Sequence, residues 1–275
     1  MSDCIEAMKV AFGDDSEVPQ RVMLGSSLFM PARVGESAGI KVVGVAPGNP
    51  VGVVVVFDAG GNPVGVVDGP TVTAMRTAAG AGLATDLLAP PDASTLAMLG
   101  AGAMAADQVE AVRSVRPIDR VLIWSRTADR AHALAEQIDD GEVVLDAGEA
   151  VAQADVVTTA TPATRPLFDG DSVRAGTHLN AIGAFTPEMC EIPPETVRAA
   201  FVVVDDLDAA AEEAGDVIQA GKTPDATVGD LLAGRATHAA EPITLFKSVG
   251  IGSQDVAAAA TALVRAAERG IGTTF

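Results

Sequence analysis

The segment Ser94–Ala106, which reads STLAMLGAGAMAA, decides the fold of this chain. A short apolar run leads into the pattern G-x-G-x-x-A, and a segment with helical character follows. This order of strand, glycine turn and helix is the beginning of a βαβ unit that binds a dinucleotide. Gly100 permits the tight turn and Gly102 lets the backbone approach a pyrophosphate. Ala105 stands where a small residue lets the helix pack closely on the strand.

The acidity of the chain limits how such a cofactor can bind. The formal net charge is −19 at pH 7 and the isoelectric point is about 4.3. This charge argues against nucleic acid and anionic membranes as partners. Phosphate groups must therefore be held by local positive potential. The N–H groups at the helix start, around Ala103 and Met104, and a few arginines can supply it.

Length and composition indicate a globular protein with one large or two smaller domains. The chain has 275 residues, of which 48% are hydrophobic, and this content excludes a disordered protein. We find no apolar run long enough to cross a bilayer and no secretory signal, so we expect a cytoplasmic protein. Cys4 and Cys190 provide no disulfide framework, and the histidines and cysteines do not have the spacing of metal ligands.

Hydrophobic periodicity divides the chain into two parts. Before residue 92 the pattern is a mixture of helix and β-rich segments, and from 92 to 246 short apolar strands alternate with helices. Such alternation is typical of an α/β fold with a buried parallel sheet. The expected strands are 21–23, 28–30, 41–45, 51–58, 63–67, 95–99, 120–124, 142–145, 155–159, 178–182 and 201–204. The expected helices are 3–12, 71–88, 103–115, 128–138, 148–152, 207–214 and 254–268.

The residues after the second strand of the dinucleotide unit bear on the choice of cofactor. A carboxylate at that strand end would bind the ribose hydroxyls of NAD. Here the strand 120–124 is followed by Ser125, Arg126 and Thr127 instead. Arg126 can pair with a 2′-phosphate, and the two hydroxyls can donate to it. We therefore predict NADP as the cofactor, with NAD possible if Arg126 stacks on adenine or only faces solvent.

Two other strand ends carry candidate residues. Thr159, Ala160 and Thr161 follow the strand 155–159 and form either a wall for the nicotinamide ribose or an ordinary strand–loop junction. Asp205 directly follows the strand 201–204, at the sheet edge where such folds bind ligands, and could move protons at a C–N bond. We interpret Asp206 and Asp208 as a solvated pair that caps the next helix.

Isolated cations in apolar segments form a further group of candidates. Lys41 opens a β-like segment of a lysine-poor chain, and Arg76 lies in a helix of small and apolar residues. A buried arginine requires an anion, which can be a substrate carboxylate, a phosphate or a structural aspartate. The long side chain of Lys41 can instead place its ammonium group in solvent. Arg21 is a weaker candidate. We interpret the histidines as structural; these are His132, His178 and His238.

In combination, these segments resemble the ornithine cyclodeaminase/mu-crystallin family. The resemblance runs in order over nearly the whole chain, and it is the ordered set of motifs that is specific. The matching segments are 30–32, 39–43, 68–69, 73–79, the glycine turn, 115–118, 124–127, 159–162, 176–184, 204–205, 213–216 and 245–250.

The resemblance implies a two-domain, homodimeric oxidoreductase. Residues 92–246 would form the Rossmann dinucleotide-binding domain, and residues 1–91 with 247–275 an α+β domain for substrate binding and dimerisation. By match to the family motifs, Arg21, Lys41 and Arg76 would hold the substrate carboxylate. Catalysis would fall to Asp205 as acid/base, together with Lys41. The resemblance also places Ser248 at the cofactor and Val249 at the substrate, both near the nicotinamide.

The resemblance leaves several functions open. The leading hypothesis is NAD(P)-dependent chemistry at an amino-acid C–N bond: reduction of a cyclic imino acid (a ketimine such as pyrroline-2-carboxylate) or ornithine cyclodeamination. Alanine dehydrogenase-like deamination and a non-catalytic, NADPH- or ligand-binding protein are alternatives. Two departures from the family motivate the last. The chain begins almost at the family's first helix, and the compressed stretch 46–53 has Val53 in place of a cofactor-contacting threonine.

Overall fold

The computed structural model describes residues 1–45, 51–238 and 243–273, and the chain forms two compact units. The first unit consists of Met1–Ala79 with Gly250–Phe275, and the second of Gly80–Val249. The predicted domain boundaries were 91/92 and 246/247. The compact units divide at 79/80, within the uninterrupted helix α2 (Gly69–Leu88), and at 249/250. Residues 46–50 of the compressed stretch are not among the described residues.

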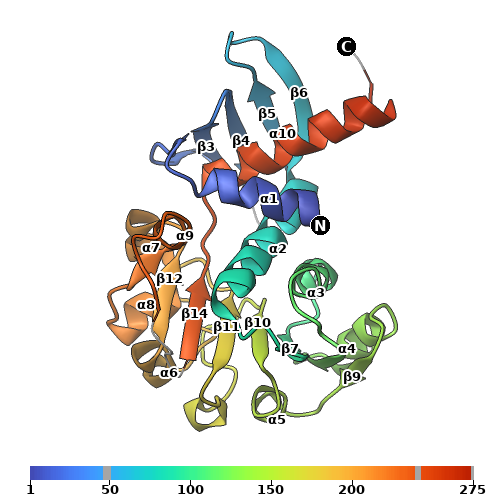
Figure 1. The fold of residues 1–275 in the computed structure, drawn as a ribbon, viewed down its shortest axis with the longest axis vertical. Coiled ribbons are helices and arrows are strands. Elements are labelled where there is room, and N and C mark those ends of the chain that lie inside the picture. Colours follow the sequence, from blue (N-terminus) through green and yellow to red (C-terminus); the bar gives the residue numbers. More distant parts are fainter. Residues whose placement is uncertain (46–50, 239–242, 274–275) are drawn as a thin grey trace. The chain divides into compact units, whose positions relative to one another are not determined.

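The first unit is an antiparallel sheet with helices on it. Its strand order is β1-β3-β4-β5-β6, and β2 pairs with β3. The helix α10 (Gly252–Arg269) crosses one face of this sheet and α1 (Ser2–Ala11) packs against α10 (Figure 1). The strands are β1 (Ser16–Glu17), β2 (Val22–Leu24), β3 (Ser27–Val34), β4 (Ser37–Gly44), β5 (Gly52–Phe57) and β6 (Pro63–Asp68).

Alternation along the strands decides which side chains face α10. Val54 and Val56 of β5 are buried, whereas Val53 is exposed. Two glycines permit the close approach of the helix. A Cβ at Gly39 would lie 2.9 Å from a methyl group of Val256, and a Cβ at Gly65 would lie 2.5 Å from Leu263. The first part of the chain therefore builds a sheet with one covered face.

The second unit is a parallel, doubly wound sheet in the order β13-β12-β14-β11-β10-β7-β8-β9. The strand β7 lies between β10 and β8, so the strand order reverses beside it. Such a reversal opens a crevice at the carboxyl ends of the strands. The strands are β7 (Thr95–Leu99), β8 (Arg120–Trp124), β9 (Gly141–Val143), β10 (Val156–Thr159), β11 (Thr177–Ala181), β12 (Phe201–Val204), β13 (Ala226–Thr227) and β14 (Ile243–Lys247).

Helices cover both faces of this sheet. On β7, Leu96 and Met98 pack into a core with α3 and α4, while Ala97 and Leu99 pack into a second core with α5, α6, α7 and α8. This alternation confirms the predicted α/β fold with strands buried on both faces. The helices are α3 (Ala105–Arg113), α4 (Ala128–Ala135), α5 (Ala147–Val151), α6 (Pro194–Ala199), α7 (Leu207–Glu213), α8 (Gly215–Ala220) and α9 (Val228–Leu232), with a 3-10 turn at Gly170–Ser172.

The sequence missed one strand of the second unit that matters for the site. β14 lies between β11 and β12 although it follows both in sequence. Its five residues carry no alternation, and its final lysine is fully buried, so no local pattern marks it. One smaller expectation was also wrong: Lys41 lies inside β4 rather than at the start of the strand.

Candidate active site

The glycine turn after β7 has the geometry that a dinucleotide requires. Gly100 adopts a φ of +113°, and a Cβ there would lie 2.6 Å from the carbonyl oxygen of Ala160. Its N–H donates to the carbonyl of Trp124 at 2.8 Å. A Cβ at Gly102 would meet no atom of the described residues within 4 Å, and Ala105 is fully buried. The turn therefore touches the loop after β10 and presents open backbone at Gly102.

The start of α3 presents backbone N–H groups without a side-chain cap among the described residues. Ala103 and Met104 precede the helix, and within the described chain no side chain caps its first turn. First-turn N–H groups without caps can bind an anion. Asp107 lies in that turn, and burial together with nearby Glu110 raises its pKa. This segment fits a dinucleotide through its backbone rather than through charged side chains.

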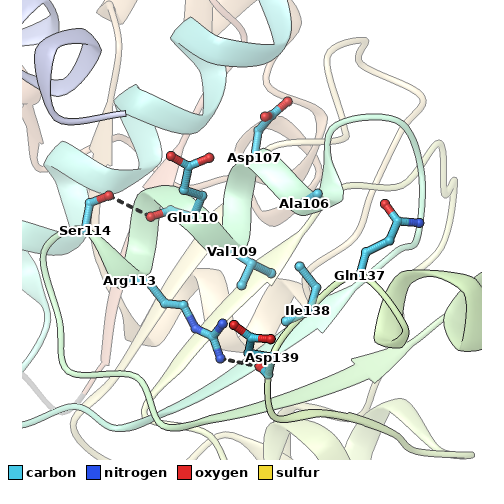
Figure 2. A pocket seen from close by; sticks show the side chains of 9 residues that line it. All are labelled: Ala106, Asp107, Val109, Glu110, Arg113, Ser114, Gln137, Ile138 and Asp139. Carbon is cyan, nitrogen blue, oxygen red and sulfur yellow. Dashed lines mark hydrogen bonds between the residues drawn. The ribbon is translucent and has the colours of Figure 1, made fainter.

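A separate hollow of about 390 Å³ lies between α3 and the residues 137–139 that follow α4. It contains three carboxylates and one arginine, Arg113, which donates to the carbonyl of Asp139 at 2.5 Å (Figure 2). None of the predicted site residues lines this hollow. Its acidic lining makes it unsuited to a phosphate.

The residues after β8 present hydrogen-bond donors at the carboxyl end of that strand. Ser125 is half-buried, and Arg126 and Thr127 are exposed. The Thr127 N–H donates to the Ser125 hydroxyl at 3.3 Å, which closes the turn. An exposed guanidinium beside two hydroxyls can bind a 2′-phosphate, and these positions carry no carboxylate to repel it.

Three predicted residues meet at the other side of the second unit. Asp205, at the end of β12, is 5% exposed. Its Oδ2 accepts a hydrogen bond from the Ser248 hydroxyl at 2.9 Å and from the Val249 N–H at 2.8 Å. β12 and β14 run parallel and pair, so their carboxyl ends are neighbours. The adjacent Asp206 caps α7 through the Ala209 N–H, which confirms its predicted role.

Lys41 and Arg76 come together in the first unit, around a carboxylate that sequence analysis missed. Asp255 Oδ1 pairs with Lys41 Nζ at 3.0 Å and with Arg76 Nε at 3.1 Å. Lys41 is 4% exposed, Arg76 6% and Asp255 fully buried. We call these three residues the cationic cluster. Two cations against one carboxylate leave a formal charge of +1 in a buried position.

The surroundings of the cationic cluster reinforce its need for an anion. Among the described residues, the amide donor Gln254 Nε2 is buried without a hydrogen-bond partner and can donate to an anion, whereas Asp255 Oδ2, which also lacks a partner, can only accept. Gln254 Oε1 accepts from Arg76 Nη1 at 3.2 Å. Burial lowers the pKa of Lys41 to about 8, and Asp255 only partly offsets this effect. A bound anion would stabilise both cations.

Arg21 lies in the same unit and is fixed to the start of the last helix. Its Nη2 donates to the carbonyl of Gly250 at 2.9 Å. Gly250 has a φ of +80°, and a Cβ there would collide with the guanidinium of Arg76. The glycine is therefore required both by its conformation and by the space that Arg76 occupies.

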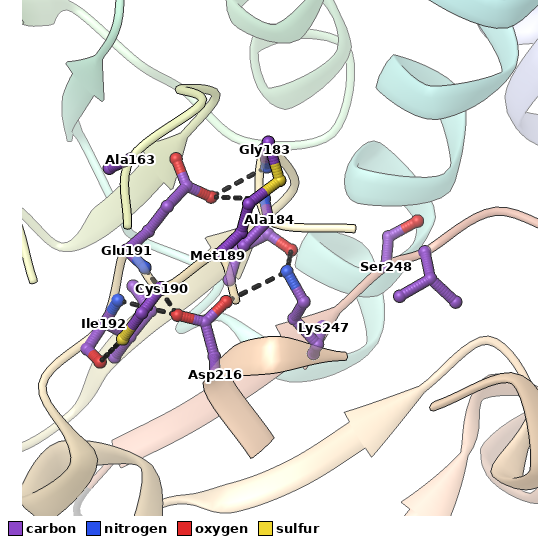
Figure 3. Close-up of polar contacts among 12 residues, drawn as sticks. Ala163, Gly183, Ala184, Met189, Cys190, Glu191, Ile192, Asp216, Lys247 and Ser248 are labelled. Carbon is purple, nitrogen blue, oxygen red and sulfur yellow. Dashed lines mark hydrogen bonds and ion pairs between the residues drawn. The ribbon is translucent and has the colours of Figure 1, made fainter. Parts of the chain in front are cut away.

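A second buried cluster, also missed from the sequence, lies in the second unit (Figure 3). Lys247 Nζ pairs with Asp216 Oδ2 at 3.0 Å, and Asp216 Oδ1 accepts the N–H groups of Glu191 and Ile192 at 2.6 and 2.9 Å. Glu191, Asp216 and Lys247, which we call the carboxylate cluster, are almost fully buried. Their formal charge is −1. Burial, reinforced by Asp216, raises the pKa of Glu191.

The buried histidine of β11 serves the core of the sheet. His178 contacts the hydroxyl of Thr244 at 2.9 Å and Asn180 Oδ1 at 3.1 Å. Burial lowers the pKa of His178 to about 3, so it is neutral at physiological pH. This geometry supports the structural interpretation of His178.

Among the described residues, none of the helices is both long and apolar enough to cross a membrane.

The sequence profile of the ornithine cyclodeaminase/mu-crystallin family matches residues 10–269. The chain belongs to this family. The ketimine reductase mu-crystallin of Mus musculus is 38% identical over 194 residues. These residues are 70% of this chain and 62% of the mouse protein, so the match spans less than two thirds of that relative.

Two solved structures extend the comparison over the whole chain. The Delta(1)-pyrroline-2-carboxylate reductase of Thermococcus litoralis, in complex with NADH and L-proline, has a TM-score of 0.92 and 30% identity, and covers 99% of this chain and 95% of its own. The dimer of an archaeal alanine dehydrogenase with bound NAD has a TM-score of 0.91 and 27% identity, and covers 100% of this chain and 94% of its own. The fold is therefore that of nicotinamide-dependent enzymes.

Proposed function

We propose that this protein is an NAD(P)-dependent reductase of a cyclic imino acid, such as pyrroline-2-carboxylate. The observation that carries the proposal is the cationic cluster, because a buried charge of +1 beside the amide donor Gln254 Nε2, which has no hydrogen-bond partner among the described residues, calls for a small anion. A substrate carboxylate meets this need. The names of the relatives, a ketimine reductase and a pyrroline-2-carboxylate reductase with bound L-proline, support the same substrate class.

Each residue would have a distinct task in this reaction. Arg76 and Lys41 would bind and align the carboxylate, and Arg21 would assist from the same unit. A bound nicotinamide dinucleotide supplies the hydride for the imine carbon. The imine nitrogen needs a proton, which Asp205 would deliver. Its fixed hydrogen bonds to Ser248 and Val249 hold that carboxyl group in one orientation.

The cofactor would be held along the carboxyl edge of the parallel sheet. The turn at Gly100 and Gly102 would receive the pyrophosphate, and the loop of Thr159, Ala160 and Thr161 would line the nicotinamide ribose. We propose NADP(H) as the preferred form because Arg126 replaces the usual carboxylate. Arg126→Ala should lower kcat/KM for NADPH about tenfold and leave the value for NADH nearly unchanged.

We also propose a homodimer formed through the outer face of the first sheet. Val53, Val64 and Val66 lie on the face turned away from α10 and are 41%, 52% and 45% exposed. Adjacent apolar side chains on an exposed sheet face favour association, and one similar structure is a dimer. Val66→Glu should shift the protein to monomer in light scattering. The exposed Val264 of α10 provides a control, since Val264→Glu should not.

The location proposed for this enzyme is the cytoplasm. Cys4 and Cys190 are both free and buried. Burial raises their pKa values, to about 11 for Cys4 and about 12 for Cys190, so both remain thiols. Unpaired thiols suit a reducing compartment.

The proposal is tested by following the absorbance of reduced nicotinamide with purified protein. Pyrroline-2-carboxylate or piperideine-2-carboxylate should cause oxidation of NADPH, and more slowly of NADH. Ornithine with NAD, monitored for ammonia, tests the cyclodeaminase alternative that the family also contains. Binding of NADPH without turnover of any imino or amino acid would refute a reductase and favour a binding protein.

A further inference from the structure

The carboxylate cluster joins loops that belong to the cofactor-binding edge. Glu191 Oε1 accepts hydrogen bonds from the N–H and the hydroxyl of Thr161, at 2.7 and 2.8 Å. Glu191 Oε2 accepts from the N–H groups of Gly183 and Ala184, at 2.7 and 3.1 Å. One side chain thus holds the loop after β10 and the loop after β11 together (Figure 3 shows the contacts to Gly183 and Ala184).

The two loops approach so closely that only a glycine fits between them. A Cβ at Gly183 would collide with the backbone N and O of Thr161. The preceding residue, Ala160, already contacts Gly100 of the glycine turn. A continuous series of contacts therefore leads from Gly100 through the loop after β10 to Glu191.

The protonation state of Glu191 follows from its partners. Burial raises its pKa, but four donors point at its two oxygens. A carboxyl proton would need an acceptor, and each oxygen already faces two donors. In this arrangement Glu191 is a carboxylate. Lys247 neutralises Asp216, to which it is bound directly, so the charge of −1 remains on the cluster.

The strand order places this charge toward one end of the cofactor. Arg126 follows β8 on one side of β7 and would bind the adenosine half. Thr161 and Gly183 follow β10 and β11 on the other side, so they flank the nicotinamide half. Oxidised nicotinamide is positively charged and reduced nicotinamide is neutral. A buried negative charge on that side favours the oxidised form.

We propose that the carboxylate cluster positions the loops after β10 and β11 and makes the protein bind oxidised nicotinamide more tightly, relative to the reduced form, than it otherwise would. This inference rests on the proposed dinucleotide-dependent function. Within that function it names Glu191 as a positioning residue and assigns the cluster an electrostatic effect. A site that stabilises the oxidised form favours hydride transfer from the cofactor to the imine.

The test is the ratio of dissociation constants for NADP⁺ and NADPH. NADPH binding is measured by its fluorescence and NADP⁺ binding by displacement. Glu191→Gln removes the charge with little change in size. A unit charge acting over roughly 10 Å at an effective dielectric constant of about 20 changes affinity by about tenfold, so the preference for NADP⁺ should fall by about that factor.

A second variant separates charge from positioning and remains informative if Glu191→Gln does not fold. Asp216→Asn also brings the cluster from −1 to 0, and its amide oxygen can still accept the N–H groups of Glu191 and Ile192; because Lys247 loses its carboxylate partner, the variant should also be less stable, and its folding is checked by its melting temperature. It should lower the preference for NADP⁺ by a similar factor. Glu191→Asp keeps the charge but shortens the side chain. It should therefore weaken the binding of both NADP⁺ and NADPH and leave the ratio of their dissociation constants unchanged.

Asp155 provides the matched control. It accepts the N–H groups of Ser94 and Thr95 at 3.0 and 3.1 Å. These residues lie at the amino ends of β7 and β10, whereas Glu191 contacts the loops at the carboxyl ends of β10 and β11. Asp155→Asn should lower the melting temperature and leave the ratio unchanged. If the ratio of the dissociation constants for NADP⁺ and NADPH is unchanged in Glu191→Gln and Asp216→Asn, the proposed electrostatic role is wrong. Wild-type protein that binds neither form would refute the proposed function itself.

Discussion

The cationic cluster and the carboxylate cluster each consist of three buried charged residues, with two cations and one carboxylate in the first and two carboxylates and one cation in the second. Each joins a lysine of a strand to an aspartate in the first turn of a helix, Lys41 with Asp255 in one unit and Lys247 with Asp216 in the other. Arg76 gives the first cluster a charge of +1, whereas Glu191 gives the second a charge of −1. Beside the first cluster the Gln254 Nε2 donor has no hydrogen-bond partner among the described residues, whereas each oxygen of Glu191 in the second cluster accepts from two donors.

This difference separates a site built for a ligand from a scaffold that supports one. A buried donor without a partner costs free energy, and we propose that a substrate carboxylate accepts from Gln254 Nε2, which has no hydrogen-bond partner among the described residues. A saturated carboxylate instead fixes the backbone of its neighbours. We therefore expect substitutions in the cationic cluster to affect substrate binding. Those in the carboxylate cluster should affect folding and cofactor preference.

The largest expected effect lies at Asp205, outside both clusters. Asp205→Asn keeps the size of the side chain and removes its ability to transfer a proton. We expect kcat to fall about a thousandfold, the middle of the range for general acid–base catalysis, while the dissociation constant for NADPH changes little. Steady-state kinetics and fluorescence titration measure the two quantities. Turnover close to wild type would remove Asp205 from its proposed role.

Stability should distinguish the two lysines. Lys247→Met leaves Asp216 buried without its cation, and we expect a loss of about 3–5 kcal/mol in the free energy of unfolding. Lys41→Met should leave the free energy of unfolding nearly unchanged or raise it, because Arg76 still pairs with Asp255 and because burial disfavours the Lys41 ammonium. Urea unfolding at pH 7 compares them.

An exposed ion pair calibrates that comparison. Arg120 pairs with Glu142 at 2.9 Å on the surface, so Arg120→Met should cost at most about 1 kcal/mol. Equal losses for Lys41→Met and Lys247→Met would show that the two clusters do not differ in the way described.

A smaller effect should appear in the pH dependence of substrate binding. The pKa of Lys41 is lowered to about 8, so the free protein loses this charge as the pH rises through that value. A carboxylate ligand then has to bind with uptake of a proton, and KM should rise by up to about tenfold per pH unit above pH 8. Lys41→Arg retains its charge over this range and should flatten the profile. The same rise in KM in Lys41→Arg would assign the titration to another group.

Local sequence was sufficient for the features that depend on neighbouring residues. The turn at Gly100 and the position of Asp205 at a strand end were predicted because both depend on a few consecutive residues. Lys41 and Arg76 stood out because charged residues are rare in their apolar segments.

The partners of those residues could not be read from the sequence. Asp255 lies 214 positions from Lys41 and 179 from Arg76, and in the sequence it has only the character of a helix start. Glu191 contacts Thr161 across 30 positions and follows a loop without periodicity. Such contacts depend on the tertiary fold, and the unpredicted strand β14 is what brings Lys247 to Asp216.

The most direct test of the central claim is the binding of L-proline and of L-prolinamide, which has a neutral amide in place of the carboxylate, to protein saturated with NADP⁺, measured by calorimetry. If the cationic cluster receives the carboxylate, wild type should bind proline at least about 100-fold more tightly than prolinamide, and Arg76→Gln should lose most of that preference. Equal binding of the two ligands by wild type, or an intact preference in Arg76→Gln, would contradict the account.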